Sequence, residues 1–236
     1  AVVAARNAQE AWAGRSAYNR GQILYRIAEV LEGRSGQFVE ELVLLGAGEA
    51  EAQAEVASSV DRFVYYAGWA DKYQQVFSSV NPVASSHFCF STLEPMGVVG
   101  LLAGEAAPLL GLVSLVAPTI VGGNTAVALA SMSRPLPAVT LGEVLATSDL
   151  PAGVVNILTG ERAELLEHFG SHMDINAVVY AAGSVQEAAL LRELACGNVK
   201  RVIQWDEGSW AGESGEGPYP ITALQEVKTT WHPIGF

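Results

Sequence analysis

The chain has 236 residues, which is long enough for one large domain to bury a substantial core. Half of the residues are hydrophobic and only 16% are charged, a composition too apolar for a disordered chain. Its 25 acidic and 13 basic residues give a net charge of −12, and the absence of any basic cluster argues against a nucleic-acid-binding surface.

The two cysteines, Cys89 and Cys196, have no metal-ligand spacing and cannot build a disulfide framework, so we expect a reducing, cytoplasmic compartment. Residues 98–130 include one charged residue, Glu105, but glycines and prolines divide them into pieces shorter than the roughly 20 residues of a membrane-spanning helix. No signal-peptide pattern is seen at the N-terminus. The chain starts without Met and inside a helical pattern, which suggests a piece of a longer protein.

Residues 1–75 predict an N-terminal helical part. One apolar stripe with charges opposite predicts an amphipathic helix with the inward residues Ile23, Ile27, Val30 and Leu31. A second long helix is predicted over residues 50–73, with the inward residues Val56, Val60, Phe63, Val64 and Ala67. In the next segment, residues 76–95, extended structure is indicated by Val83, Phe88 and Phe90.

From Met96 onward, short apolar runs alternate with helical patterns, which predicts a parallel sheet with helices on both faces. The expected strands are residues 97–103, 125–130, 154–158, 177–181 and 201–205. Between them, helices are expected at residues 109–121, 138–147, 162–170 and 185–196. This α/β part spans residues 96–207.

The last part of the chain breaks the alternation. Residues 208–218 are rich in Gly, Ser and acidic side chains and predict a loop. Residues 219–236 include Leu224, Val227 and Thr229, which suit a strand near the end of the chain.

Short motifs along the chain form a specific set. They are Glu94, Pro95, Gly97 and Val98 (E-P-x-G-V); Gly123, Asn124 and Thr125 (G-N-T); Leu150, Pro151, Gly153, Val154, Asn156 and Gly160 (L-P-x-G-V-x-N-x-x-x-G); Asn198, Val199, Lys200, Arg201 and Val202 (close to N-L-K-R-V); and Glu226, Val227, Lys228 and Thr229 (E-V-K-T). As a set they resemble the aldehyde dehydrogenase superfamily, and most of all the C-terminal non-catalytic region of a family-16 aldehyde dehydrogenase.

This resemblance implies an α/β fold with a Rossmann-like five-stranded parallel sheet and N-terminal helices. It also implies a small β oligomerisation element, built from a strand segment at residues 76–95 and a C-terminal strand within residues 219–236. The family's catalytic domain, an α/β unit of roughly 150–200 residues, has no counterpart between these parts.

The resemblance locates polar catalytic side chains that this sequence lacks. Ala106 stands at the Asn of P-W-N-F-P, which donates to the oxyanion, and the loss of one such donor costs about 10²–10³-fold in rate. Trp205 stands at the general-base Glu of L-E-L-G-G. Asp206 or Glu207 could replace that base only after a one-residue slip, which would turn the carboxylate to the opposite face of a strand.

The family's cofactor contacts are also replaced. Leu129 and Met132 lie in the segment where K-P-x-E binds the adenosine ribose, and neither side chain can hydrogen-bond a hydroxyl group. The pyrophosphate turn F-T-G-S corresponds to the segment that ends in Gly183 and Ser184, where a small anion nest could remain. Glu187 adds a carboxylate that competes with phosphate for the positive end of the next helix.

Neither cysteine matches the family's nucleophile, and we expect Cys89 and Cys196 to be small, buried apolar groups. A hydrolase that uses Ser184 or Ser209 would need a His–acid partner that the sequence does not suggest.

The four histidines are candidate metal ligands. His168 and His172 have a spacing compatible with zinc, but a helix end is expected between them and no third ligand is evident. We therefore expect both of them, like His87 and His232, to be solvated loop residues.

These departures predict no catalytic, cofactor-binding or metal-binding residues in this chain. The predicted function is assembly through the segment 83–93 and the strand 224–230. The partner would be a second copy, giving a homodimer, or an N-terminal catalytic aldehyde dehydrogenase domain of the same polypeptide. The parent protein would then be an NAD(P)-dependent aldehyde dehydrogenase or a pseudoenzyme homologue. The alternative is a regulatory NAD(P)-binding module that kept the cofactor cleft and lost the catalytic residues.

Overall fold

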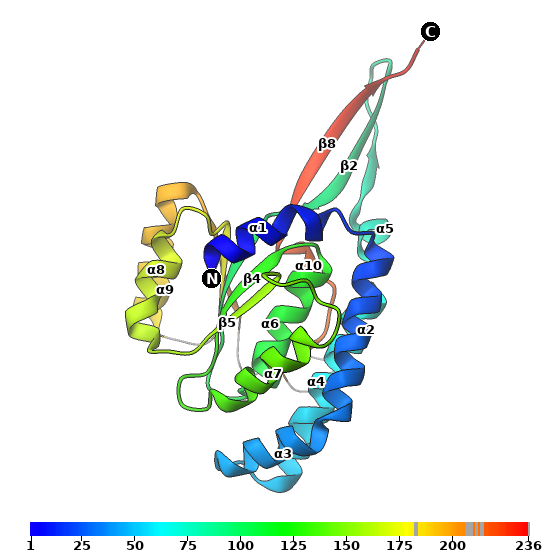
Figure 1. Ribbon diagram of the computed structural model, residues 1–236. Helices are drawn as coiled ribbons and strands as arrows, with labels where there is room; N and C mark the ends of the chain where they lie inside the picture. Colours follow the sequence, from blue (N-terminus) through cyan, green and yellow to red (C-terminus); the bar gives the residue numbers. More distant parts are fainter. Residues whose placement is uncertain (182–183, 206–209, 211, 213–214, 236) are drawn as a thin grey trace.

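The computed structural model describes residues 1–181, 184–205, 210, 212 and 215–235. A parallel sheet lies at the centre, helices cover both of its faces, and a narrow antiparallel sheet projects from one end of the body (Figure 1). The alternating sequence pattern predicts this α/β arrangement.

The central sheet has five parallel strands in the order β5-β4-β3-β6-β7. They are β3 (Val98–Leu102), β4 (Thr125–Leu129), β5 (Val155–Leu158), β6 (Ala177–Ala181) and β7 (Arg201–Trp205), each within its predicted range. Strands β3, β4 and β6 are buried throughout, which explains their unbroken apolar runs. The chain order reverses between β3 and β6, and ligands of such sheets bind beside this point, at the carboxyl ends of the strands.

Alternate residues of each strand enter two separate cores. Val99 and Leu101 of β3 face α6 (Leu110–Val121), onto which α2 (Ala17–Gly33) and α4 (Glu49–Trp69) pack, with α7 (Leu136–Ala146) beside them. Val98 and Leu102 face the other side, which is covered by α1 (Val2–Ala13), α8 (Arg162–Ser171) and α9 (Val185–Ala195).

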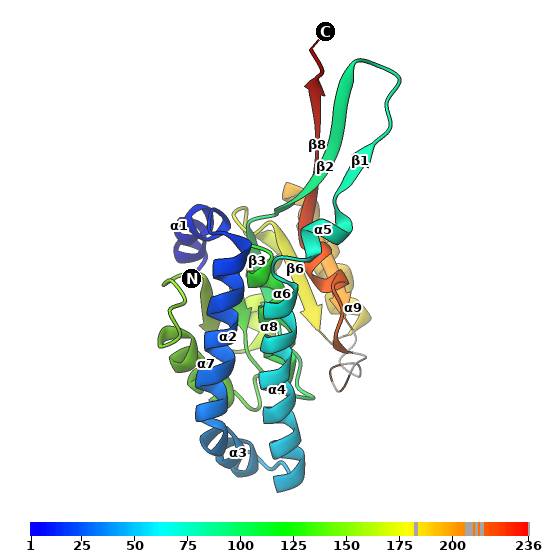
Figure 2. The ribbon, with the colours of Figure 1, turned by 90° about the vertical axis from the view of Figure 1, so that its right-hand side faces the viewer.

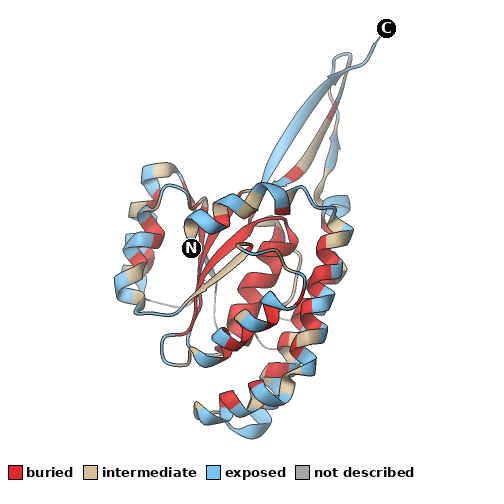
Figure 3. Cartoon of the chain, viewed as in Figure 1, coloured by how far each residue is buried: buried red, intermediate tan, exposed pale blue. Residues whose placement is uncertain are grey.

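Helix α6 is buried along its whole length (Figure 3), because the sheet lies on one side of it and other helices lie on the other. This position accounts for its apolar character all round. It has 12 residues, and no helix in the described ranges is both long and apolar enough to cross a membrane.

The second sheet has three antiparallel strands in the order β1-β2-β8. They are β1 (Ser79–Asn81), β2 (His87–Pro95) and β8 (Gln225–Pro233). Strands β2 and β8 pair over nine residues, from His87 opposite Pro233 to Pro95 opposite Gln225. Figure 2 shows this sheet extending beyond the body, and Figure 3 shows that most of β8 is exposed.

Several boundaries differ from the sequence-based expectation. Helix α4 ends at Trp69, before the predicted end at residue 73, and Val64 is 41% exposed instead of inward. The reason is that α2 and α6 pack on the face that carries Phe63 and Ala67. Val83 lies outside the strands, and a short helix, α10 (Tyr219–Thr222), precedes β8. Two further short helices, α3 (Ser35–Leu44) and α5 (Tyr73–Phe77), complete the helical N-terminal part.

Candidate functional site

Two loops at the carboxyl ends of β3 and β4 are tied together by Glu105. Its carboxylate accepts hydrogen bonds from Ser131 Oγ at 2.6 Å, from the Met132 N–H at 2.8 Å, and from both the N–H and the hydroxyl of Ser133. Burial alone would raise the pKa of Glu105, but the bonds from Ser131 and Ser133 outweigh it and lower that pKa below its usual value. The loop where the resemblance locates the family's oxyanion donor is thus bound to the loop where it locates the family's ribose contacts.

Three positions where the resemblance locates polar contacts of the family carry apolar side chains: Ala106, Leu129 and Met132. Ala106 is exposed, and its carbonyl oxygen accepts from Arg134 Nη2 at 3.0 Å. Leu129 is buried in the core facing α1 and α8, whereas Met132 is 48% exposed. None of these side chains can donate to an oxyanion or to a ribose hydroxyl.

Arg162, the first residue of α8, lies where the strand order reverses. Its guanidinium donates to the carbonyl oxygens of Ala103 at 3.1 Å and of Ala181 at 3.2 Å. It stacks 4.7 Å above the Tyr180 ring, and its Nε lies 3.9 Å from Oε1 of Glu187. The sequence analysis does not identify Arg162. A signal was present, because a basic side chain at a helix N-terminus is unfavourable with respect to the helix dipole and therefore suggests a role outside the helix.

Glu187 and Ser184 form a capping box at the N-terminus of α9. Ser184 Oγ accepts the Glu187 N–H at 3.1 Å, and Glu187 Oε2 accepts the Ser184 N–H at 3.1 Å. The Tyr180 hydroxyl also donates to Glu187 Oε2, and burial followed by this bond raises the pKa of Tyr180 to about 12. A carboxylate therefore occupies the helix end that would otherwise suit a phosphate. Gly183, the other part of the expected nest, lies outside the described residues.

Arg62 of α4 fixes the loop that follows β7. This side chain is 1% exposed and donates to Ser114 Oγ at 2.7 Å and to the carbonyl oxygens of Trp210 at 2.7 Å and Gly215 at 2.6 Å. Sequence reasoning missed Arg62 as well. The signal was a charged residue directly beside Phe63 on the apolar stripe of a helix, where an unpaired charge is costly.

The expected general-base position holds an aromatic pair. The ring centroids of Trp205 and Trp210 lie 6.3 Å apart in an edge-to-face arrangement. Asp206, Glu207 and Ser209, the alternative catalytic groups that the sequence offers, lie outside the described residues.

One of the two expectations for the cysteines is wrong. Cys89 is buried in β2, as expected, and Asn81 Nδ2 lies 3.5 Å from its sulfur. Cys196 is exposed, contrary to the expectation, because the helix turns its side chain outward, where the thiol donates to the Arg192 carbonyl oxygen at 3.3 Å.

The histidines occupy regular elements more often than the expected loops. His168 lies within α8, and His172 caps that helix, which ends at Ser171, between the two histidines as expected. His87 and His232 lie in β2 and β8. Within the described ranges, no group of three or more His, Cys, Asp or Glu side chains is placed to hold a metal ion.

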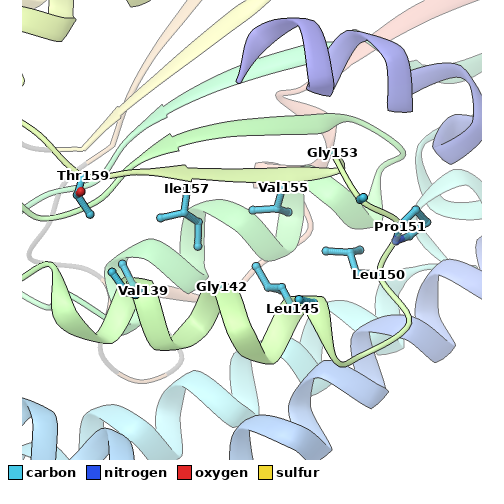
Figure 4. A pocket seen from close by; sticks show the side chains of 12 residues that line it. Val139, Gly142, Leu145, Leu150, Pro151, Gly153, Val155, Ile157 and Thr159 are labelled. Atoms are coloured by element: carbon cyan, nitrogen blue, oxygen red, sulfur yellow. The ribbon is translucent and has the colours of Figure 1, made fainter.

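A pocket of about 380 Å³ lies between α7 and the edge strand β5. In Figure 4, Val139, Gly142 and Leu145 of α7 face Val155 and Ile157 of β5. Every residue that lines this pocket is non-titratable, so its lining supplies no general acid or base.

Comparison with known proteins places this geometry in a family. The model of the aldehyde dehydrogenase family matches residues 1–205. The chain is 32% identical over 209 residues to cytosolic aldehyde dehydrogenase 1 of Elephantulus edwardii, in an alignment that covers 86% of this chain and 41% of that protein. It is 30% identical over 211 residues to cytosolic 10-formyltetrahydrofolate dehydrogenase of Homo sapiens, covering 86% of this chain and 23% of that protein.

Solved structures give the same relation. PnpE from Pseudomonas sp. WBC-3 superimposes with a TM-score of 0.82 at 27% identity, over 86% of this chain and 41% of that chain. A mutant of aldehyde dehydrogenase C from Pseudomonas syringae, crystallised with NAD⁺ and octanal, gives a TM-score of 0.78 at 29% identity, over 87% and 41% of the two chains.

The chain spans less than half the length of these relatives, so only part of the enzyme architecture is shared. Its five-stranded sheet, helices α1 to α9 and most of its sequence fall inside the matched residues 1–205, whereas α10 and β8 lie outside them. This chain therefore belongs to the aldehyde dehydrogenase family.

Proposed function

We propose that this chain is a non-catalytic aldehyde dehydrogenase region that acts in assembly, as the C-terminal region of a family-16 type protein. The observation that carries the proposal is the projecting sheet of β1, β2 and β8, in which β8 is an edge strand of nine residues (Figure 1). An exposed strand edge presents unpaired backbone groups, and natural proteins cover such edges because they promote aggregation.

Apolar side chains on the same sheet support this proposal. Val227 is 66% exposed and Trp231 is 57% exposed, and the two share one face of the sheet, whereas Phe88 on β2 is exposed on the opposite face. Clustered apolar exposure marks interaction surfaces in soluble proteins. The proposed partner is a second copy related by a two-fold axis, or a catalytic domain of the same polypeptide.

The proposal assigns no turnover to this chain. Ala106 supplies no oxyanion donor, Trp205 replaces the base, and the residues at the cofactor positions do not fit NAD(P), because Glu187 occupies the phosphate end of α9. The purified chain with an aldehyde and NAD or NADP should form no reduced cofactor above a protein-free blank. Aldehyde oxidation that disappears on mutation of Cys89 or Cys196 would contradict the proposal.

Removing β8 tests the assembly role. The cut belongs after Glu226, because Ile221 and Leu224 are buried and Arg201 donates to the Ala223 and Gln225 carbonyl oxygens, so an earlier cut would damage the core. We expect a chain that assembles at full length to become a monomer or an aggregate in light scattering.

Point variants distinguish a specific role of the projecting sheet in assembly from a general effect of adding charge to the surface. Val227→Lys/Trp231→Lys should reduce assembly, whereas Val3→Lys/Val185→Lys, at positions on α1 and α9 that are more exposed, should not. A truncated chain that keeps both its oligomeric state and its solubility would show that β8 is not the assembly element.

A regulatory NAD(P)-binding module is the second candidate function, and the retained strand reversal between β3 and β6 favours it. Titration calorimetry with NAD and NADP distinguishes the two. A Kd below about 100 μM, or roughly −5.5 kcal/mol, would support the module. The assembly proposal expects weaker binding, because Arg162 and Glu187 already fill the reversal point.

A further inference from the structure

A groove between α3 and α4 has a volume of about 640 Å³, and neither proposed function uses it. Its floor is apolar and consists of Val39 from α3 together with Val56, Ala57 and Val60 from α4. Figure 2 shows α3 packed across the ends of α2 and α4, at the end of the molecule opposite the projecting sheet.

The rim of the groove is acidic. Glu32 at the end of α2, Glu40 on α3, and Glu49 and Asp61 on α4 all line it, and all four are exposed. Glu49 accepts a hydrogen bond from Gln53 Nε2 at 3.3 Å. Among the ion pairs of the described residues, none includes any of these four carboxylates.

The chain itself offers these carboxylates little positive charge. Residues 35–61 contain six acidic residues and no Lys, Arg or His. The two basic residues that flank this stretch have other partners. Arg34 is bound to Glu143 of α7 at 2.7 Å and to Gln37. Arg62 is buried and donates to Ser114 and to the carbonyl oxygens of Trp210 and Gly215. Like charges around one cavity repel each other, and a cationic ligand would relieve this repulsion while covering the apolar floor.

The shape of the groove indicates the form of such a ligand. On α4 the groove is lined by Val56, which is 2% exposed, and by Val60 one helical turn further along, and Val39 lines it from the facing helix. A cleft between two packed helices accepts a third helix, which inserts apolar residues at i, i+3, i+4 and i+7. We propose that this groove binds a basic amphipathic helix of a partner protein, with apolar side chains on the floor and Lys or Arg side chains at the acidic rim.

The test uses a synthetic amphipathic peptide with Leu on one face and Lys on the other, and a second peptide in which Glu replaces Lys. Fluorescence anisotropy with the full chain should show binding of the basic peptide that weakens as salt is raised, and no binding of the acidic peptide. Glu40→Gln/Glu49→Gln/Asp61→Asn should weaken binding about tenfold. Glu164→Gln/Glu167→Gln/Glu193→Gln removes the same charge from exposed sites on α8 and α9 and should leave affinity within about twofold.

A matched pair on α4 tests the floor. Ala57→Lys places a cation in the groove and should abolish binding, whereas Ala54→Lys, on the same helix but outside the groove lining, should preserve it. Both residues are exposed, so neither change disturbs the core. Equal effects of the two triple variants, equal effects of the two Lys variants, or peptide protection from hydrogen exchange at β8 instead of α3 and α4 would overturn the proposal.

Discussion

At the scale of single residues, three charged side chains hold the carboxyl edge of the sheet together. Glu105 joins the loops after β3 and β4, Arg162 joins the ends of β3 and β6, and Arg62 anchors the loop after β7. Each one bonds to backbone groups of a loop or strand end, where catalytic sites of parallel sheets usually present reactive groups. These residues therefore stabilise the edge that related folds use for ligands.

The Glu105 contacts predict a pH-dependent effect. Because its folded-state pKa is lowered, ionised Glu105 contributes stability above its unfolded pKa of about 4.3, and this contribution is lost as pH falls through the folded pKa. Glu105→Gln should lower Tm by about 2–4 °C at pH 7, the effect of ~1 kcal/mol in a chain of this size. The difference from the wild type should shrink as pH falls below about 4.

Thermal unfolding followed by circular dichroism between pH 3 and 8, a range set by the usual carboxyl pKa values of about 4, measures this difference. The control is Glu167→Gln, a change at an exposed acid on α8. An equal Tm loss at every pH, or an equal loss in the control, would show that the carboxylate bonds of Glu105 do not cause the effect.

At the scale of elements, the close contact between β3 and α8 depends on one residue. A Cβ atom at Gly100 would lie 2.7 Å from Phe169 Cδ1, and Phe169 is buried against the sheet. Gly100→Ala should therefore destabilise the fold by about 1–3 kcal/mol through overpacking. Gly142→Ala on α7, where a Cβ meets nothing within 4 Å, should be neutral or stabilising by up to about 1 kcal/mol.

Denaturant unfolding of the two Ala variants compares them directly. The double variant Gly100→Ala/Phe169→Leu should recover part of the stability, because a smaller side chain removes the clash. Equal stability of Gly100→Ala and the wild type would mean that α8 moves away from β3 without cost.

The sequence predicts an element well when neighbouring residues determine it, and poorly when contacts with distant segments do. The strands of the central sheet follow from short apolar runs, so β6 and β7 match their expected bounds. The prediction that Val64 and Cys196 are buried is wrong, because the elements packed around a helix decide which of its faces is covered. For Val64 these elements are α2 and α6. The bonds of Arg62, Glu105 and Arg162 link segments far apart in the chain, and residue spacing carries no signal for such pairs.

At the scale of the whole molecule, the two proposed interaction surfaces lie at opposite ends. Strand β8 projects at one end, and the groove of α3 and α4 lies at the other (Figures 1 and 2). Between them, α4 packs on α6 and α6 packs on the sheet, in one continuous buried core. Coupling between distant sites requires an element with two arrangements, and we expect the closely packed core between these surfaces to keep a single one.

The two surfaces should therefore act independently. Cutting the chain after Glu226 should change its oligomeric state and leave the Kd for the basic peptide within about twofold. Ala57→Lys should abolish peptide binding and leave the oligomeric state unchanged. Because a binding coupling is reciprocal, the two measurements check each other. A change of more than about tenfold in peptide affinity on loss of β8 would reveal a coupling free energy above ~1.4 kcal/mol. The two surfaces would then belong to one interface or to one conformational switch.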